Sequence, residues 1–222
     1  MTSLREPVIV EGRPCAARGR NLARRLHASN ATVGTIGGLG VRGPVALRRA
    51  GASVVVQHTD GSIEVIRDTK SHALTAPGPV SKLAAGGPLV CALLVDGAVA
   101  CGPAAGAALT NVLPAGSASA VAVGGAFEGF ACAILVAAGV SCWGDDVSSI
   151  LGEDTVLQPT ISTTPLGLDG GANKVVRLRA GADHTCAVTT AGDALCWGNS
   201  HHGQVGNGTY GVGVPPKKIL GL

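Results

Sequence analysis

Six of the seven cysteines in this chain fall into three pairs, and the two members of each pair are ten residues apart. The pairs are Cys91 and Cys101, Cys132 and Cys142, and Cys186 and Cys196, which leaves only Cys15 over. One spacing found three times in 222 residues points to a repeated structural unit rather than to three separate sites. Any fold for this chain therefore has to place the same cysteine pair at the same point of successive units.

The last two units agree well beyond their cysteines. In both, the second cysteine is followed directly by Trp-Gly, and another glycine lies eight residues after that glycine. A threonine comes three residues later, and a Gly-Leu pair comes twelve residues after the threonine. We therefore assign as structural residues of the repeat Trp143, Gly144, Gly152, Trp197, Gly198, Gly203 and Gly206.

An earlier unit keeps the pattern without cysteines. When the Asp-Gly turns are aligned, the segment 53–66 overlays the segment 89–102, and Val55 and Val65 occupy the two cysteine positions. Four units result. They lie near 47–79, 80–117, 118–174 and 175–222, after an atypical basic segment at 1–46.

The apolar residues of each unit occur in short runs bounded by glycine, aspartate and proline. Runs of four to seven residues rich in Val, Leu, Ile and Ala are typical of β-strands, and 34 Gly and 12 Pro supply the turns. Because these runs are apolar almost throughout, we expect the strands to be covered on both faces. A radial stack of small antiparallel sheets, each covering its neighbours, meets that requirement. The sequence therefore predicts an all-β fold.

The register of the cysteine hairpins follows from their turns. If 190–192 is a three-residue loop with its glycine in the left-handed conformation, Thr189 faces Asp193. Counting outward, Cys186 then faces Cys196 in a non-hydrogen-bonded pair, with Cα atoms about 4.5 Å apart. That distance is at the short end of the range that a disulfide spans. The same count works for the second unit, whereas the turn glycine of the third lies one residue later and leaves its register open.

The paired cysteines allow three interpretations. As disulfides they would staple the hairpins and imply an oxidising location, extracellular or in the cell envelope. As free thiols they would be small buried apolar residues, in keeping with a cytoplasmic location. As metal ligands they would have to converge, and thiolate sites usually have tighter spacing. The repeated spacing favours disulfides at all three pairs, although the first 30 residues show no secretory signal. No metal site is expected.

The segments HTCAV, CWGN, HHGQVGNGT and PPKKILGL of the last unit resemble the repeat of the regulator of chromosome condensation family. The resemblance is strongest over 181–222, extends over 121–168, and weakens over 82–102 and 47–66. The family's repeat forms a β-propeller of short antiparallel blades, usually seven. The resemblance thus implies an incomplete β-propeller of about four repeats. A fragment, a degenerate member and a protomer that completes its propeller by self-association all fit that number.

The function that the resemblance implies is that of a non-enzymatic scaffold for protein–protein recognition. The founding member of the family is a nucleotide-exchange factor for a small GTPase, so regulation of a GTPase is the alternative. We take His201, His202 and Gln204, in the Gly-rich loop of the last unit, as the candidate binding loop. Neither a catalytic residue nor a cofactor is expected, since the usual signatures of hydrolases, zinc proteases and P-loops are missing from the sequence.

A competing interpretation comes from Gly38–Gly43, which fits G-x-G-x-x-G and has Asp60 about twenty residues further on. It would make the chain a dinucleotide-binding enzyme. The context is poor, because Pro44–Ala50 leaves room for only about two turns of helix, too few for a βαβ crossover.

The net charge of +3 conceals an asymmetry, since residues 1–50 hold nine Arg against two Glu and the remainder holds eight Lys or Arg against twelve Asp or Glu. The basic arm suits either solvent or an acidic surface. Aromatic residues make up only 2% of the chain, which argues against single-stranded nucleic acid as a partner. No stretch reaches the roughly 20 apolar residues that span a bilayer.

Overall fold

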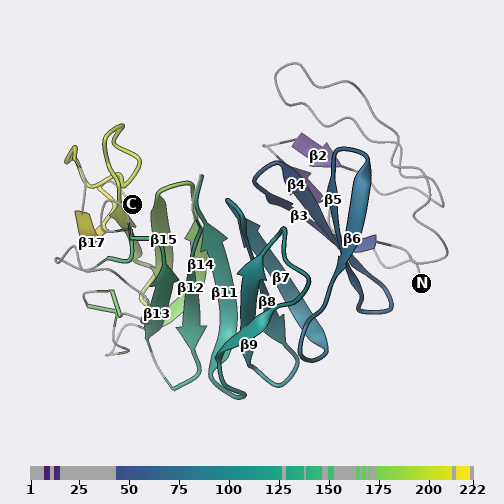
Figure 1. The fold of residues 1–222 in the computed structure, drawn as a ribbon. Coiled ribbons are helices and arrows are strands. Elements are labelled where there is room, and N and C mark those ends of the chain that lie inside the picture. Colours follow the sequence, from purple (N-terminus) through teal and green to yellow (C-terminus); the bar gives the residue numbers. More distant parts are fainter. Residues whose placement is uncertain are drawn as a thin grey trace, which may run out of the picture.

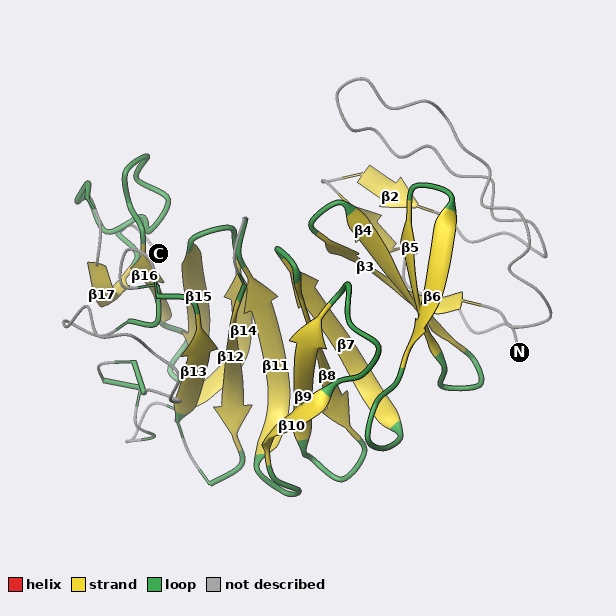
Figure 2. Cartoon of the chain, viewed as in Figure 1, coloured by secondary structure: helices red, strands yellow, loops and turns green. Residues whose placement is uncertain are grey.

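The structure is a computed structural model, which describes residues 8–10, 13–15, 44–126, 129–137, 139–146, 150–152, 164–165, 167–168, 170, 174–211 and 214–220. Over these residues the protein consists of β-strands and their connections (Figure 2). The predicted all-β class is confirmed. Within the described ranges there is no long apolar helix of the kind that crosses a membrane.

The strands form four antiparallel sheets that follow one another in chain order (Figure 1). The first sheet contains β3 (Pro44–Ala50), β4 (Ser53–His58), β5 (Ile63–Arg67) and β6 (Lys70–Leu74). The second contains β7 (Val80–Gly86), β8 (Leu89–Leu94), β9 (Val99–Pro103) and β10 (Thr110–Leu113). The third contains β11 (Ala118–Gly124), β12 (Phe130–Leu135) and β13 (Val140–Gly144). The fourth contains β14 (Val175–Ala180), β15 (His184–Thr189), β16 (Ala194–Gly198) and β17 (Val214–Lys218).

The four sheets begin at Pro44, Val80, Ala118 and Val175. The division of the chain into units near 47–79, 80–117, 118–174 and 175–222 stays a prediction. In the basic segment 1–46, the described residues before Pro44 are those of β1 (Val8–Val10) and β2 (Arg13–Cys15), which pair in a small separate hairpin.

The strand β3 also contradicts the dinucleotide interpretation. Gly38–Gly43 themselves lie outside the described residues. The fingerprint requires a helix after its last glycine, where the chain forms the strand Pro44–Ala50. The dinucleotide interpretation is therefore wrong in its structural context.

The hairpins have the predicted register. Thr189 N–H donates to Asp193 O at 2.9 Å, and Gly192 has a positive φ of 85°. Cys186 lies opposite Cys196, as Cys91 does opposite Cys101 in the second sheet. The third sheet keeps this register as well, with Cys132 opposite Cys142. Gly139 there occupies the closing pair of the turn rather than its last loop position, and its carbonyl accepts a hydrogen bond from Leu135 N–H at 3.0 Å.

The core lies between the sheets rather than within any one of them. Val55 and Val65 of the first sheet, 1% and 0% exposed, pack in one cluster with Leu83 and Ala92 of the second. The cysteine faces of the second and third sheets are buried in the same way against the sheets that follow them. Each sheet thus buries one face on the next, which is why its strands are apolar on both sides.

The first strands of the sheets stand next to one another, and glycines allow the close approach. A Cβ on Gly86 would lie 2.7 Å from the carbonyl oxygen of Val123 in the next sheet. One sheet further on, Gly125 N–H donates to Gly181 O at 3.2 Å. The glycine that ends each first strand is therefore needed where neighbouring sheets meet.

Each first strand also carries an irregularity that the sequence did not reveal. Its pairing with the second strand shifts at the same place in all four sheets, between Pro44 and Ala46, Val80 and Lys82, Ala118 and Ala120, and Val175 and Arg177. A bulge of this kind bends a strand and increases its twist. Its recurrence shows that the repeat extends to backbone geometry, where the four side-chain sequences differ.

Candidate functional site

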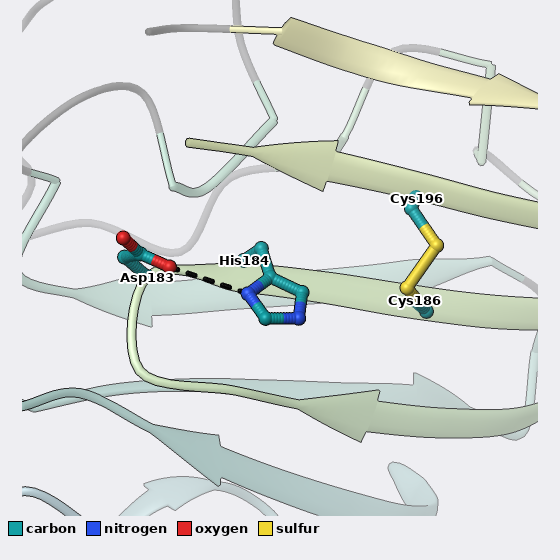
Figure 3. Close-up of a disulfide and its surroundings, with 4 residues drawn as sticks. All are labelled: Asp183, His184, Cys186 and Cys196. Carbon is teal, nitrogen blue, oxygen red and sulfur yellow. Dashed lines mark hydrogen bonds and ion pairs between the residues drawn. A yellow bond between two sulfur atoms is a disulfide. The ribbon is translucent and has the colours of Figure 1, made fainter. Parts of the chain in front are cut away.

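The three cysteine pairs form disulfides across neighbouring strands, as the spacing indicated. The Cα–Cα distances are 4.1 Å for Cys91–Cys101, 4.0 Å for Cys132–Cys142 and 4.1 Å for Cys186–Cys196. Figure 3 shows the last of them bridging β15 and β16. Because Val55 and Val65 hold the equivalent positions of the first sheet, this position accepts either a disulfide or an aliphatic pair.

The surroundings of the three disulfides differ. Cys91 and Cys132 are 0% exposed because the following sheet covers them. Cys186 is only partly buried, while its partner Cys196 packs on Val205 and Val214 of its own unit. The last disulfide is therefore the most accessible of the three.

The two tryptophans of the repeat pack between sheets. Trp143 belongs to the cluster that contains the Cys91–Cys101 disulfide, and Trp197 to the one that contains Cys132. A Cβ on Gly152 would lie 2.8 Å from the Trp197 ring, so only a glycine fits there. Both side chains therefore serve packing and are not exposed as ligand platforms.

The loop that contains the candidate binding residues, residues 199–211, is held by its own hydrogen bonds. Ser200 N–H donates to Gly211 O at 2.7 Å, and its hydroxyl donates to Thr209 O at 2.9 Å. Asn207 Oδ1 accepts from Thr209 N–H and its hydroxyl, at 3.0 and 2.7 Å. The bonds of Ser200 join the two ends of the 199–211 loop, and those of Asn207 order its second half.

A carboxylate on the neighbouring turn fastens the loop to the sheet. Asp183 Oδ1 accepts from Gln204 Nε2 at 3.4 Å and lies 3.2 Å from His184 Nδ1 (Figure 3). The backbone carbonyl of Asp183 accepts from Asn199 N–H at 2.9 Å. The turn before β15 and the 199–211 loop thus form one surface at the same end of the fourth sheet.

The predicted binding residues take different positions in this surface. His201 and His202 are exposed. Gln204 is half-buried, since its amide nitrogen contacts Asp183 and its Oε1 accepts from His202 N–H at 2.8 Å. Gln204 therefore orders the loop, and its role in binding stays a prediction.

The sequence analysis missed one exposed residue of this surface. Tyr210 is 78% exposed and lies beside Gly203. It is the only tyrosine of the chain, and it lies in the same loop as His201 and His202. Its position in that loop would have been enough to identify it as a candidate binding residue. Tyrosine combines an apolar ring with a hydroxyl and is common in binding surfaces.

The polar groups of this surface include one pair of titratable side chains. Asp183 and His184 form a carboxylate–imidazole pair, without a nucleophilic side chain among their described hydrogen-bond partners. Over the described part of the chain, no group of three or more His, Cys, Asp or Glu is placed to hold a metal ion.

The stack of three- and four-stranded antiparallel sheets, with Trp and disulfide packed between neighbours, defines the class of protein. It is an all-β repeat protein of the β-propeller type. Residues 175–204 match the family described as Regulator of chromosome condensation (RCC1) repeat. The match lies in the fourth unit, where the resemblance to this repeat was expected to be strongest.

Comparisons with known proteins agree with that class. The chain is 45% identical over 56 residues to the E3 ubiquitin-protein ligase HERC2 of Homo sapiens, a stretch that covers 25% of this chain and 1% of that protein. Its fold is similar to that of human WBSCR16, with a TM-score of 0.66 and 16% identity over 80% of this chain and 53% of the other. The fold is also similar to that of Prp20p of Saccharomyces cerevisiae, with a TM-score of 0.65 and 15% identity over 85% of this chain and 53% of Prp20p. The chain therefore spans about half the length of these solved structures.

Proposed function

We propose that this protein is a non-enzymatic scaffold for protein–protein recognition, with the 199–211 loop as its binding surface. The observation that carries the proposal is the combination of a loop fixed by internal hydrogen bonds with three exposed side chains on it, His201, His202 and Tyr210. A surface that is ordered before binding loses little conformational entropy when a partner docks.

The structural neighbours support this proposal. Prp20p of Saccharomyces cerevisiae has binding properties toward Gsp1p and histones, and the same yeast protein has been solved with Kap60 bound to it. Proteins of this fold therefore bind other proteins. The partner of this chain is proposed only as a protein.

The experiment is affinity capture with a matched control. The protein with His201→Ala, His202→Ala and Tyr210→Ala is expected to lose the partners that the unaltered protein retains. The control is Val95→Ser, which changes a 70% exposed residue at a hairpin turn of the second sheet. A partner set that is unchanged in the loop variant would refute the 199–211 loop as the binding surface.

The alternative function is regulation of a small GTPase, which the fold shared with Prp20p favours. It is tested by the release of a fluorescent guanine nucleotide from purified small GTPases. Release accelerated by catalytic amounts of this protein would establish exchange activity. Release at the intrinsic rate, with capture of a non-GTPase partner, would leave the scaffold function alone.

The location and the self-association of the chain are proposals of the same kind. Three disulfides favour an oxidising location, outside the cell or in its envelope. Mass measurement of protein isolated without reductant, before and after reduction and alkylation, would detect bonds formed in the cell. The partly buried Cys186 face supports a contact with a second copy, which light scattering would reveal as a doubled mass.

A further inference from the structure

The first strands of the four sheets carry positive charge without negative charge. Five cationic side chains project from these strands, and all five are exposed: Arg48, Arg49, Lys82, Arg177 and Arg179. Neither aspartate nor glutamate occurs on β3, β7, β11 or β14. The first strands of the first, second and fourth sheets therefore carry only positive charge.

These strands form a continuous wall, because β3 contacts β7, β7 contacts β11, and β11 contacts β14. We call the exposed side of these four strands the basic wall. The wall gathers residues that are far apart in the sequence, since Arg48 and Arg179 come from the first and the fourth unit. No local sequence motif would have joined them.

Arg48 and Arg179 hold equivalent positions in their units. Arg48 pairs with Val55 and Arg179 with Cys186, which are themselves equivalent. Each guanidinium donates to the carbonyl of the preceding leucine at 2.9 Å. Arg48 Nε also donates to Leu83 O, in the next sheet, at 2.9 Å. Both arginines are thus anchored through backbone oxygens, with further N–H groups left to donate.

The positive charges of the wall also act on one another. Burial, followed by the charge of Arg179, lowers the pKa of Arg48. Arg48 and Arg179 come from β3 and β14, the first strands of the first and the fourth sheet. The cationic side chains of the wall therefore repel one another.

The repulsion is not relieved within the described part of the chain. There, Arg48, Lys82, Arg177 and Arg179 have no carboxylate partner within ion-pair distance. Arginine stays protonated even when its pKa falls, because the ordinary value lies above 12. A ligand with negative charge would thus bind to groups that are already oriented and poorly neutralised.

We propose that the basic wall binds an acidic segment of a partner protein, an extended peptide rich in aspartate and glutamate. The planar guanidinium fork matches a carboxylate and forms two parallel hydrogen bonds with it. The wall has no Phe, Tyr or Trp on its four strands, whereas binding of single-stranded nucleic acid relies on aromatic stacking. This inference rests on the proposed recognition function and names the chemistry of the partner.

The test is the binding of a rhodamine-labelled peptide of ten alternating Asp and Glu residues, followed by fluorescence anisotropy. The Arg48→Gln, Arg179→Gln protein is expected to bind at least about tenfold more weakly, since it lacks the charge-assisted bonds of both guanidinium groups. The charge-matched control is Lys70→Gln, Lys217→Gln, which removes two exposed cations from the outer strands β6 and β17. It is expected to change the affinity less than about twofold, as surface charges outside a site contribute little.

Each other outcome overturns the proposal. An equal loss of peptide affinity in the control protein would mean that the peptide is attracted nonspecifically by the net charge. If an unlabelled oligonucleotide displaced the peptide at an equal concentration of charge, the wall would be assigned to nucleic acid. No binding by the unaltered protein would refute the acidic-peptide site. If the protein with Arg48→Gln and Arg179→Gln fails to fold, a protein with Arg48→Lys and Arg179→Lys takes its place. This variant keeps both positive charges but lacks the planar guanidinium groups. An unchanged affinity of the lysine variant for the peptide would refute bidentate recognition. The loop variant of the capture experiment should still bind the peptide, so failure of the 199–211 surface is seen separately.

Discussion

At the scale of single residues, the fold depends on positions where a side chain would not fit. Gly86 and Gly152 lie against a backbone oxygen and a tryptophan ring of the following sheet. The repeat spacing identified Gly152 as structural. Gly86 was visible only as the end of a strand-like run, because the atom it approaches belongs to another unit.

Gly86→Ala should destabilise the protein by about 1–3 kcal/mol, the usual penalty for forcing an extra methyl group into a packed contact. The added Cβ would meet Val123 O at 2.7 Å, and a backbone oxygen has no alternative rotamer. Urea unfolding measures the change. The control is Gly78→Ala, whose Cβ would make an ordinary 3.5 Å contact with Leu94. Equal stability of the two variants would contradict a tight contact between the sheets.

Asp146→Asn should raise the free energy of unfolding at pH 7. Burial raises the pKa of Asp146, with the charge of Asp145 adding to it and the N–H of Leu151 opposing it. A carboxyl whose pKa is raised in the native state binds its proton more readily there than in the unfolded chain. The free energy of unfolding therefore increases as the pH falls from the raised pKa of the folded state toward the pKa of an unfolded aspartate, about 3.9. The amide keeps the 3.0 Å acceptor for Leu151 N–H but carries no charge.

The measurement for Asp146→Asn is urea unfolding at several pH values between 4 and 7. The variant should show a smaller gain in stability on acidification than the unaltered protein. Asp96→Asn is the control, since Asp96 Oδ1 likewise accepts from a backbone N–H, that of Ala98, at 2.9 Å. If the stability of the Asp146→Asn protein depended on pH in the same way as that of the unaltered protein, the Asp146 carboxylate would not be the source of the gain in stability on acidification.

At the scale of elements, the hairpin was the part that the sequence predicted best. Its turn, its register and the facing cysteines all follow from one glycine and from alternation, which are local properties. The bulge in every first strand was not predictable, because the residues at the shift differ between the four strands and carry no common sequence signal. The surface that joins Asp183 to Gln204 was missed for the same reason, since 21 residues separate them.

The Cys186–Cys196 disulfide should be reduced first. The fourth sheet leaves Cys186 partly exposed, whereas Cys91 and Cys132 are fully covered. Thiol–disulfide exchange requires access of the attacking thiolate, so a limiting amount of dithiothreitol should reduce the last bond at least about tenfold faster. Stepwise alkylation with two isotopic reagents, followed by peptide mass analysis, gives the order. Simultaneous reduction of all three would mean that global unfolding controls access.

At the scale of the whole molecule, four similar sheets share their cores with their neighbours. The sequence predicted this arrangement from strands that are apolar on both faces. It could not predict the basic wall, because its cationic side chains belong to different units, whose first strands contact one another only in the folded protein. The Gly38–Gly43 motif illustrates the reverse case. Its local pattern matched a known fingerprint, but the strand Pro44–Ala50 stands where that fingerprint requires a helix.

Stability should decrease toward the fourth sheet. The second sheet buries Cys91 and Val99 completely between two neighbours, while Cys186 and Val188 of the fourth remain partly exposed. In stacked repeats, local opening is easiest where a neighbour is missing. Amide hydrogens of β15 and β16 should exchange at least about tenfold faster than those of β8 and β9, as measured by mass spectrometry. Uniform protection across the sheets would show that the array unfolds as one unit.

The recurring bulge has a geometric consequence for arrays of this unit. The pairing shift falls at the same place in β3, β7, β11 and β14, so every unit offers a similarly bent first strand to its neighbour. Units that meet through equivalent strands are related by similar rotations, and equal rotations in series trace an arc of constant radius. Lengthening such a chain would add arc without altering its radius.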